Sequence, residues 1–286
     1  MQTNTIRLGG VPEHFNLPVH LAIEDGDFAS RGVNLEWTTF KGGTGQMTAA
    51  LRDGSIDACI LLTEGIVKDI IHGNPSKIIS TYVISPLIWG IHTAASNELD
   101  RYDDIFDRQY AISRFGSGSH LMAIVDANSK HTSLKREQFT IIRNLEGALS
   151  SLAAHDTDVF YWEKYTTKPY VDSGQLRRIG EFLTPWPCFV IAATDRVLED
   201  QPENVIRMLR TIHDATDRFM QRPDAIDLVS QRYAQRPQDV ERWYHSTEWA
   251  IHGWVSDKML NSVLYSLRTA ELIEAEAHIP ELIWKR

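Results

Sequence analysis

The stretch Tyr110-Ala-Ile-Ser-Arg-Phe-Gly-Ser-Gly-Ser-His120 is followed directly by the apolar run Leu121-Met-Ala-Ile-Val125. This order predicts a short buried strand, a Gly/Ser loop and a helix that begins near Ser117 or Ser119. Backbone N–H groups at a helix N-terminus have no partner within the helix, and the helix dipole adds about half a positive charge there. Glycine lets a ligand approach closely, and serine hydroxyls can bind it or cap the helix. The loop is therefore a candidate cradle for an anion or another polar ligand.

A second loop of the same kind lies in the first half of the chain. Lys41-Gly-Gly-Thr-Gly-Gln46 follows the strand-like segment Asn34-Leu-Glu-Trp-Thr-Thr39. Two strand–loop–helix units, one in each half of the chain, predict a ligand held between two lobes.

The bulk composition is that of an ordinary globular protein. With 286 residues and 43% hydrophobic residues, the chain can form one large α/β domain or two smaller ones. The net charge of −9, without a long block of Lys or Arg, argues against a nucleic-acid partner. No apolar run approaches the roughly 20 residues that a membrane helix needs, so we expect no direct membrane insertion.

The N-terminal segment Met1–Arg7 lacks the basic-then-apolar pattern of a signal peptide. We therefore expect a cytoplasmic protein if this chain is complete, and a periplasmic one if a leader has been removed. The two cysteines, Cys59 and Cys188, lie in apolar runs and are expected to be buried, inert thiols. Neither a disulfide framework nor a zinc site is supported, and no metal or cofactor is expected.

Strand-like and helix-like segments alternate along most of the chain. Ala58–Leu62 is continuously apolar, as in a strand buried on both faces, and the alternation predicts a mostly parallel sheet. Proline marks two interruptions, at Ser85-Pro86 and at Thr184-Pro-Trp-Pro187. The predicted architecture is an α/β fold with one lobe formed by residues 1–86 and 190–286 and a second by residues 87–189. The chain crosses twice between lobes that move as a hinge, and its C-terminal tail is helical.

Motifs of nucleotide binding and of nucleophilic catalysis are incomplete or absent. Gly43-Thr-Gly45 and Gly116-Ser-Gly118 begin like a dinucleotide fingerprint, but its third glycine position holds Thr48 or Leu121. No P-loop lysine follows either cluster, and no Gly-x-Ser-x-Gly elbow occurs. These departures favour a binding protein over an enzyme.

Ten residues are candidate ligand contacts. For several of them the sequence is equally consistent with a purely structural role. Arg114 can reach an anion or form a surface ion pair, and Glu64 can meet a ligand or occupy the first turn of a helix. Trp186 can line a cleft or cover a hinge, and Asn144 is expected to be a helix N-cap. The full set of expected ligand-binding residues is His14, Thr44, Thr63, Glu64, Arg114, Ser117, Ser119, Trp162, Glu163 and Trp186. Among these, the two tryptophans would form an apolar wall and the two glutamates would accept a basic nitrogen of the ligand.

Several stretches carry a resemblance to a known family. They are Pro18–Phe28 with Gly32-Val-Asn-Leu-Glu36, Gly42-Gly-Thr-Gly45, Ala50-Leu-Arg-Asp-Gly-Ser-Ile-Asp57, Arg114–Ser119 and Asp158–Glu163. Together they resemble the substrate-binding proteins of ABC importers, in the subgroup that binds aliphatic sulfonates, nitrate and thiamine-pyrimidine precursors. The resemblance covers roughly residues 6 to 195 and implies a type II periplasmic-binding-protein-like fold.

The function implied is that of a solute-binding protein that closes two lobes around a small anionic or heteroaromatic ligand. An ABC permease would be its partner if the protein is exported. The alternative is a cytoplasmic biosynthetic enzyme on the same fold, of the pyrimidine-precursor or menaquinone-pathway type, with His14 or Glu64 as general acid or base. The cysteine-rich motif of a fungal pyrimidine-synthesising branch is absent. A third reading is a sensor that associates with another protein when its ligand binds.

Overall fold

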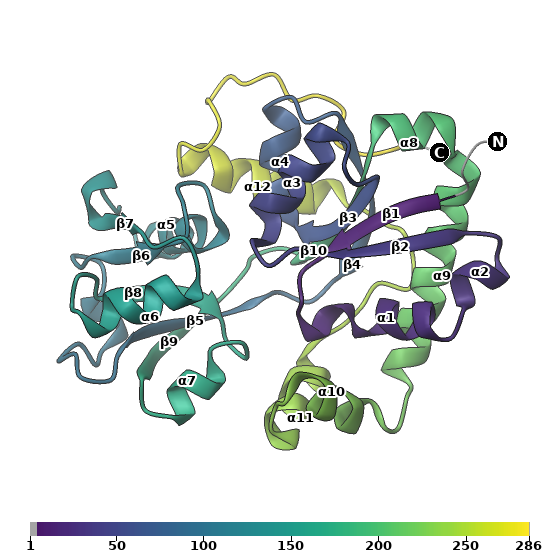
Figure 1. Ribbon diagram of the computed structural model, residues 1–286. Helices are drawn as coiled ribbons and strands as arrows, with labels where there is room; N and C mark the ends of the chain where they lie inside the picture. Colours follow the sequence, from purple (N-terminus) through teal and green to yellow (C-terminus); the bar gives the residue numbers. More distant parts are fainter. Residues whose placement is uncertain (1–4, 286) are drawn as a thin grey trace. The chain divides into compact units, whose positions relative to one another are not determined.

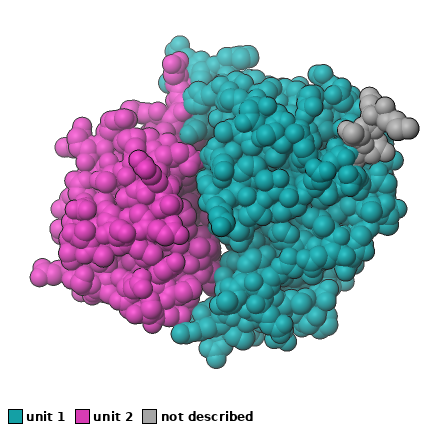
Figure 2. All heavy atoms as spheres, in the orientation of Figure 1, with its two compact units in different colours: residues 1–86, 186–264, 275–286 teal, residues 87–185, 265–274 magenta. Residues whose placement is uncertain are grey.

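Two five-stranded sheets organise the chain in the computed structural model, which describes residues 5–285. Each sheet belongs to one of two units, coloured separately in Figure 2. Unit 1 comprises Met1–Pro86, Trp186–Leu264 and Ala275–Arg286, and unit 2 comprises Leu87–Pro185 and Tyr265–Glu274. Residues 1–4, which are part of the segment searched for a leader, lie outside the described residues.

The sheet of unit 1 has the strand order β2-β1-β3-β10-β4 (Figure 1). Its strands are β1 (Thr5–Gly10), β2 (Asn34–Thr39), β3 (Ala58–Leu62), β4 (Ser76–Val83) and β10 (Phe189–Thr194). β1 pairs in parallel with β2 and β3, whereas β10 is antiparallel to both β3 and β4. Every residue of β10 is buried, as expected for a strand that is covered on both faces.

The helices of unit 1 follow from the sequence pattern. They are α1 (Leu17–Glu24), α2 (Asp27–Ser30), α3 (Gly43–Asp53), α4 (Thr63–Ile71), α8 (Asp195–Asp200), α9 (Pro202–Met220), α10 (Ala225–Tyr233) and α11 (Pro237–Ser246), preceded by the short 3-10 turn η1 (His14–Asn16). The apolar residues of α9 recur at helical spacing, and each is buried: Val205, Met208, Leu209, Ile212, Ala215 and Phe219. α3 and α4 pack together against β3 (Figure 1).

Unit 2 repeats this design with the strand order β7-β6-β8-β5-β9. Its strands are β5 (Ile88–Ala94), β6 (Tyr110–Ile112), β7 (Phe139–Ile141), β8 (Val159–Glu163) and β9 (Leu176–Leu183). Its helices are α5 (Gly118–Ser129), α6 (Leu145–Ala153) and α7 (Lys168–Asp172), with the 3-10 turns η2 (Tyr102–Asp104) and η3 (Arg136–Gln138). The last helix, α12 (Asp257–Thr269), contributes its final residues to unit 2.

The sheets confirm a mostly parallel α/β architecture, with one reversed strand in each. β6 is parallel to β7 and β8, while β5 is antiparallel to β8 and β9. The reversed strands, β5 and β10, are the ones that follow the two proline-marked interruptions. At each of these points the chain passes from one sheet to the other, from β4 to β5 and from β9 to β10, so each reversed strand is the one with which the chain enters a sheet.

Cys59 and Cys188 are free, buried thiols, as the sequence predicts. No helix among residues 5–285 is both long and apolar enough to cross a membrane. Within the same residues, no group of three or more His, Cys, Asp or Glu side chains is placed to hold a metal ion.

Candidate functional site

The Gly/Ser loop of unit 2 forms the start of α5, as predicted. Ser117 is the N-cap, and its Oγ accepts a hydrogen bond from the backbone N of His120 at 3.4 Å. Its Oγ also lies 3.0 Å from Ser119 Oγ, which accepts from the N–H of Ser113 at 3.3 Å. Gly116 has a φ of +74°, a conformation that glycine adopts without strain. The two serine hydroxyls are therefore part of the cap that orients this helix N-terminus, and the half-buried Arg114 lies at the start of the same loop.

The corresponding loop of unit 1 brings two helix N-termini together. Thr44, in the first turn of α3, accepts a hydrogen bond at Oγ1 from the N–H of Leu62 at 3.3 Å. Its methyl group packs against Gly65 of α4, where an added Cβ would lie only 2.3 Å from Thr44 Cγ2. Gly65 therefore permits this close approach of α3 and α4, each of which follows a strand of the same sheet.

Thr63 and Glu64 begin α4 and contact the segment that returns to unit 1. Thr63 Oγ1 donates to the carbonyl oxygen of Pro187 at 2.6 Å. Glu64 is 3% exposed, and its Oε2 accepts a hydrogen bond from Trp186 Nε1 at 2.9 Å. Its second oxygen, Oε1, is buried and has no hydrogen-bond partner among residues 5–285. An acceptor that is buried without a partner is unusual in a folded protein and calls for an explanation.

Burial raises the pKa of Glu64 to about 7, although the Trp186 hydrogen bond and Lys68 act in the opposite direction. The side chain therefore exchanges its proton near neutral pH. When it is protonated, the carboxyl group can donate one hydrogen bond, and when it is ionised both oxygens accept.

His14 lies in η1, directly after β1, and is 2% exposed. Its ring stacks on Phe15 at 5.0 Å between centroids and meets Trp243 edge-on at 4.1 Å. Burial lowers the pKa of His14 to about 3, so the imidazole is neutral across the physiological range.

Trp162 and Glu163 end β8 in unit 2. Trp162 is half-buried and stacks on Phe160 at 5.2 Å between centroids. The carboxylate of Glu163 accepts hydrogen bonds from the N–H of Tyr165 at 3.0 Å and from the N–H and Oγ1 of Thr166 at 2.6 and 2.8 Å. Burial raises the pKa of Glu163, while these hydrogen bonds oppose the rise. Glu163 thus organises the turn that follows its strand.

The predicted residues fall into groups within each unit. Thr44, Thr63, Glu64 and Trp186 lie at the N-termini of α3 and α4, whereas His14 contacts aromatic rings and Gln235. Arg114, Ser117 and Ser119 share one loop of unit 2, and Trp162 and Glu163 end the strand that pairs with β6.

Two side chains beside His14 were not among the predicted residues. Gln235 Nε2 lies 3.4 Å from His14 Nδ1, and Trp243 packs on the imidazole. In the sequence, the apolar periodicity of α11 presents Trp243 only as a core residue, and no local signal marks Gln235.

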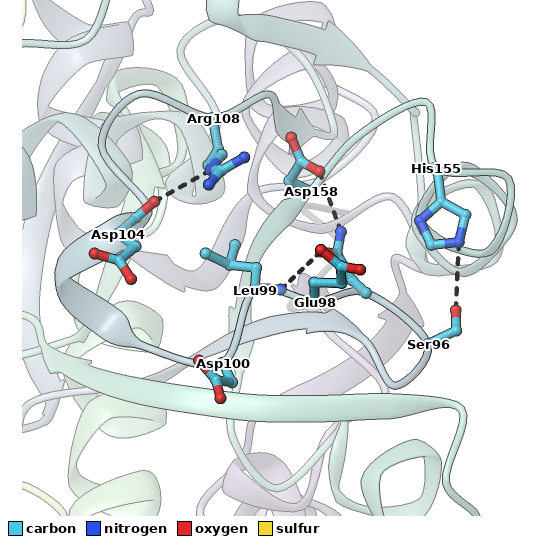
Figure 3. A pocket seen from close by; sticks show the side chains of 9 residues that line it. Ser96, Glu98, Leu99, Asp100, Asp104, Arg108, His155 and Asp158 are labelled. Carbon is cyan, nitrogen blue, oxygen red and sulfur yellow. Dashed lines mark hydrogen bonds between the residues drawn. The ribbon is translucent and has the colours of Figure 1, made fainter.

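A cavity of about 540 Å³ in unit 2 contains none of the predicted residues (Figure 3). Its lining is largely acidic, and its polar groups bond to one another. Asp158 Oδ1 accepts from Asn97 Nδ2 at 3.1 Å, and Ser96 Oγ lies 3.4 Å from His155 Nε2. This cavity resembles a solvated surface hollow more than a prepared ligand site.

Comparison with known proteins shows which family model and which solved structures the chain is similar to. Residues 89–182, most of the first segment of unit 2, match the family model of Ca3427-like periplasmic-binding proteins. The structure matches that of the CA3427 gene product of Candida albicans with a TM-score of 0.90 at 23% identity, over 99% of this chain and 98% of the other. This chain has the type II periplasmic-binding-protein fold.

Other proteins of this fold bind small solutes according to their descriptions. The alkanesulfonate-binding protein SsuA of Xanthomonas axonopodis pv. citri, bound to MOPS, matches with a TM-score of 0.83 at 16% identity, over 99% of each chain. The nitrate-binding protein NrtA of Synechocystis PCC 6803 matches with a TM-score of 0.73 at 14% identity, over 96% of this chain and 83% of the other. No curated protein matches the sequence. The resemblance to periplasmic-binding proteins that the sequence predicts is thus confirmed, and the shared fold extends over 99% of this chain.

Proposed function

We propose that this protein binds a small anionic or heteroaromatic solute by closing its two units around it, as the substrate-binding component of an ABC importer does. The observation that carries the proposal is the placement of its polar groups. In each unit a helix N-terminus follows a strand of the sheet: α3 and α4 in unit 1, and α5 in unit 2. Open α/β sheets bind ligands at the carboxyl ends of their strands, where such helix N-termini supply unpaired N–H groups.

Glu64 supplies the second part of the proposal. Trp186 holds one oxygen of its carboxyl group, and the other oxygen is buried without a partner. That oxygen suits an N–H group or a basic nitrogen of the solute. A micromolar affinity requires only about −8 kcal/mol, which a few such hydrogen bonds and aromatic contacts supply.

A second candidate function is favoured by one observation, the pKa of Glu64 near 7. A carboxyl group with such a pKa suits general acid–base catalysis at neutral pH. A biosynthetic enzyme of this kind would convert its ligand during incubation. A binding protein would return the ligand with its mass unchanged, which mass spectrometry of the released compound measures.

The proposal is tested by a thermal-shift screen of sulfonates, nitrate, thiamine precursors and flavins, followed by small-angle X-ray scattering. We expect one class to raise the melting temperature and to decrease the radius of gyration, because a ligand held by both units favours the closed state.

The variant Ser117→Trp is expected to weaken binding of that class by at least about tenfold, because an indole replaces the small cap at the start of α5. Ser129→Trp is its control, since Ser129 is exposed at the other end of the same helix. If Ser117→Trp does not fold, Glu64→Gln takes its place in the comparison. A screen in which no class raises the melting temperature contradicts the proposal, as does unchanged binding by both site variants.

A further inference from the structure

In unit 1, His14 contacts both Gln235 and Trp243, and each of these three side chains has a buried atom without a hydrogen-bond partner among residues 5–285. The atoms are His14 Nε2, Gln235 Oε1 and Trp243 Nε1. Gln235 Nε2 lies 3.4 Å from His14 Nδ1, and the indole of Trp243 lies 4.1 Å from the imidazole between centroids. The residues come from η1, from the connection between α10 and α11, and from α11 itself. A buried polar group without a partner destabilises the fold, so three such groups around one imidazole point to a hydrogen-bonding partner that the fold itself does not supply.

The hydrogen-bonding character of these atoms follows from their protonation. The amide nitrogen of Gln235 donates to His14 Nδ1, so the single proton of the neutral imidazole lies on Nε2. The cluster therefore presents two N–H donors, on His14 and Trp243, and one carbonyl acceptor, on Gln235. The Oδ1 of Asn16, in the same turn as His14, is a further buried acceptor without a partner, while its Nδ2 donates to Val11 O at 2.8 Å.

Aromatic rings enclose the imidazole. Phe15 stacks on it at 5.0 Å, and Tyr233 meets it edge-on at 5.9 Å between centroids. Such walls suit a planar group, because aromatic rings pack well against flat faces. A neutral imidazole contributes no positive charge, and the oxygens of Gln235 and Asn16 repel an anion. The occupant that fits is therefore neutral and planar, with an acceptor and a donor side by side.

We propose that His14, Gln235 and Trp243 bind the amide, urea or lactam edge of a neutral solute. The carbonyl oxygen of that edge accepts from the two N–H groups, and its N–H donates to Gln235. The inference rests on the proposed function, the binding of a small solute, and it names the chemistry that this part of unit 1 recognises. It favours a heteroaromatic lactam or carboxamide over a simple anion.

A matched pair of tryptophans allows the proposal to be tested. Trp249 packs edge-on against Trp243 at 5.5 Å, and both are 1% exposed. The indole N–H of Trp249 donates to Phe15 O at 2.9 Å, whereas that of Trp243 has no partner. Trp249→Phe thus removes a hydrogen bond already made within the fold, and Trp243→Phe removes the one kept for the ligand.

The probes are nicotinamide, uracil and urea, with acetate and methanesulfonate as anionic comparisons, measured by isothermal titration calorimetry on the full chain. We expect at least one neutral probe to bind, and Trp243→Phe and Gln235→Leu each to weaken it about tenfold, the loss of one hydrogen bond. Trp249→Phe should bind like the wild type while unfolding at a lower temperature. If Trp243→Phe does not fold, Gln235→Leu carries the comparison.

Three results would overturn the proposal: no neutral probe binds, an anion binds at least as well with the same dependence on Gln235, or Trp243→Phe and Trp249→Phe bind alike. An enclosed water without a ligand gives the first of these results. Scattering measurements separate this proposal from the proposed function. If the neutral probes bind but the radius of gyration does not decrease, the site is supported and closure of the two units is contradicted. If sulfonates bind and decrease the radius of gyration while the amides do not bind, closure is supported and this site is not.

Discussion

Replacing Glu64 with glutamine is expected to raise the free energy of unfolding at pH 8 by on the order of 2–3 kcal/mol. The wild-type carboxylate is buried: one oxygen accepts a hydrogen bond from Trp186, and the other has no partner within the described part of the chain. Glutamine is neutral at every pH, and its amide oxygen can still accept the Trp186 hydrogen bond. Urea or thermal unfolding of both proteins at several pH values measures the difference.

The pH dependence has a definite sign. Burial raises the pKa of Glu64 from 4.5 to about 7, so the folded state holds a proton that the unfolded state releases. The contribution of Glu64 to the free energy of unfolding is therefore fully present below pH 4.5 and is lost as the pH rises toward 7. The two proteins should therefore be equally stable near pH 4, and the advantage of the variant should grow up to about pH 7 and then remain constant.

Glu163 is the matched control for this prediction. Both oxygens of its carboxylate accept hydrogen bonds, from Tyr165 and Thr166, so an amide nitrogen would face N–H donors. Glu163→Gln also removes a buried charge whose pKa is raised, but the hydrogen bonds lost with the carboxylate outweigh that gain, so the variant is expected to lower the free energy of unfolding at pH 8. An equal response of the two variants would show that the pairing of each oxygen does not decide the effect.

The Glu64 prediction also links stability to binding. A carboxyl group that destabilises the fold at neutral pH is retained most readily where it contacts a ligand. Under the proposed function, Glu64→Gln should stabilise the free protein and weaken the binding of a solute with a basic nitrogen.

The fold could be predicted from local features because the sequence repeats them consistently. Continuously apolar runs such as Ala58–Leu62 marked buried strands, and short polar residues such as Ser117 and Asn144 marked helix caps. Asn144 does accept a hydrogen bond from the N–H of Gly147 at 2.9 Å. The position of β10 between β3 and β4 could not be derived in this way, because strand pairing across more than 100 residues leaves no local signal.

The sequence predicts which loops carry the candidate site, but it does not predict the contacts of the side chains in them. The sequence marked both Glu64 and Glu163 as candidate ligand contacts. The sequence could not show that the carboxylate of Glu163 accepts hydrogen bonds from the turn that follows it, while one oxygen of Glu64 has no partner among the described residues. That difference depends on side-chain geometry. His14 and Trp243 are far apart in the sequence, so the sequence around one of them does not indicate its contact with the other.

Asp57→Ala is expected to lower the free energy of unfolding by about 2–3 kcal/mol at pH 7. Asp57 precedes β3 and is 5% exposed. Its Oδ2 accepts from the backbone N–H and Nε of Arg7, each at 2.9 Å, and its Oδ1 accepts from Arg196 Nη2 at 2.8 Å. One carboxylate therefore ties β1 to the beginning of β3 and to α8. Its removal leaves the Arg7 N–H without a partner, while the partly exposed guanidinium groups regain water and limit the loss.

The dependence of this stabilisation on pH in the acid range provides a check on the prediction. Burial alone would raise the pKa of Asp57, but the hydrogen bonds from Arg7 outweigh it and lower the pKa below its ordinary value of 3.8. The stabilisation is therefore present above about pH 4 and is lost as the pH falls further, so the two unfolding curves should converge in acid. Asp214→Ala is the control, since its ion pair with Arg31 is exposed and should contribute less than about 1 kcal/mol. A loss for Asp57→Ala no larger than that of the control would show that this carboxylate does not hold the sheet of unit 1 together.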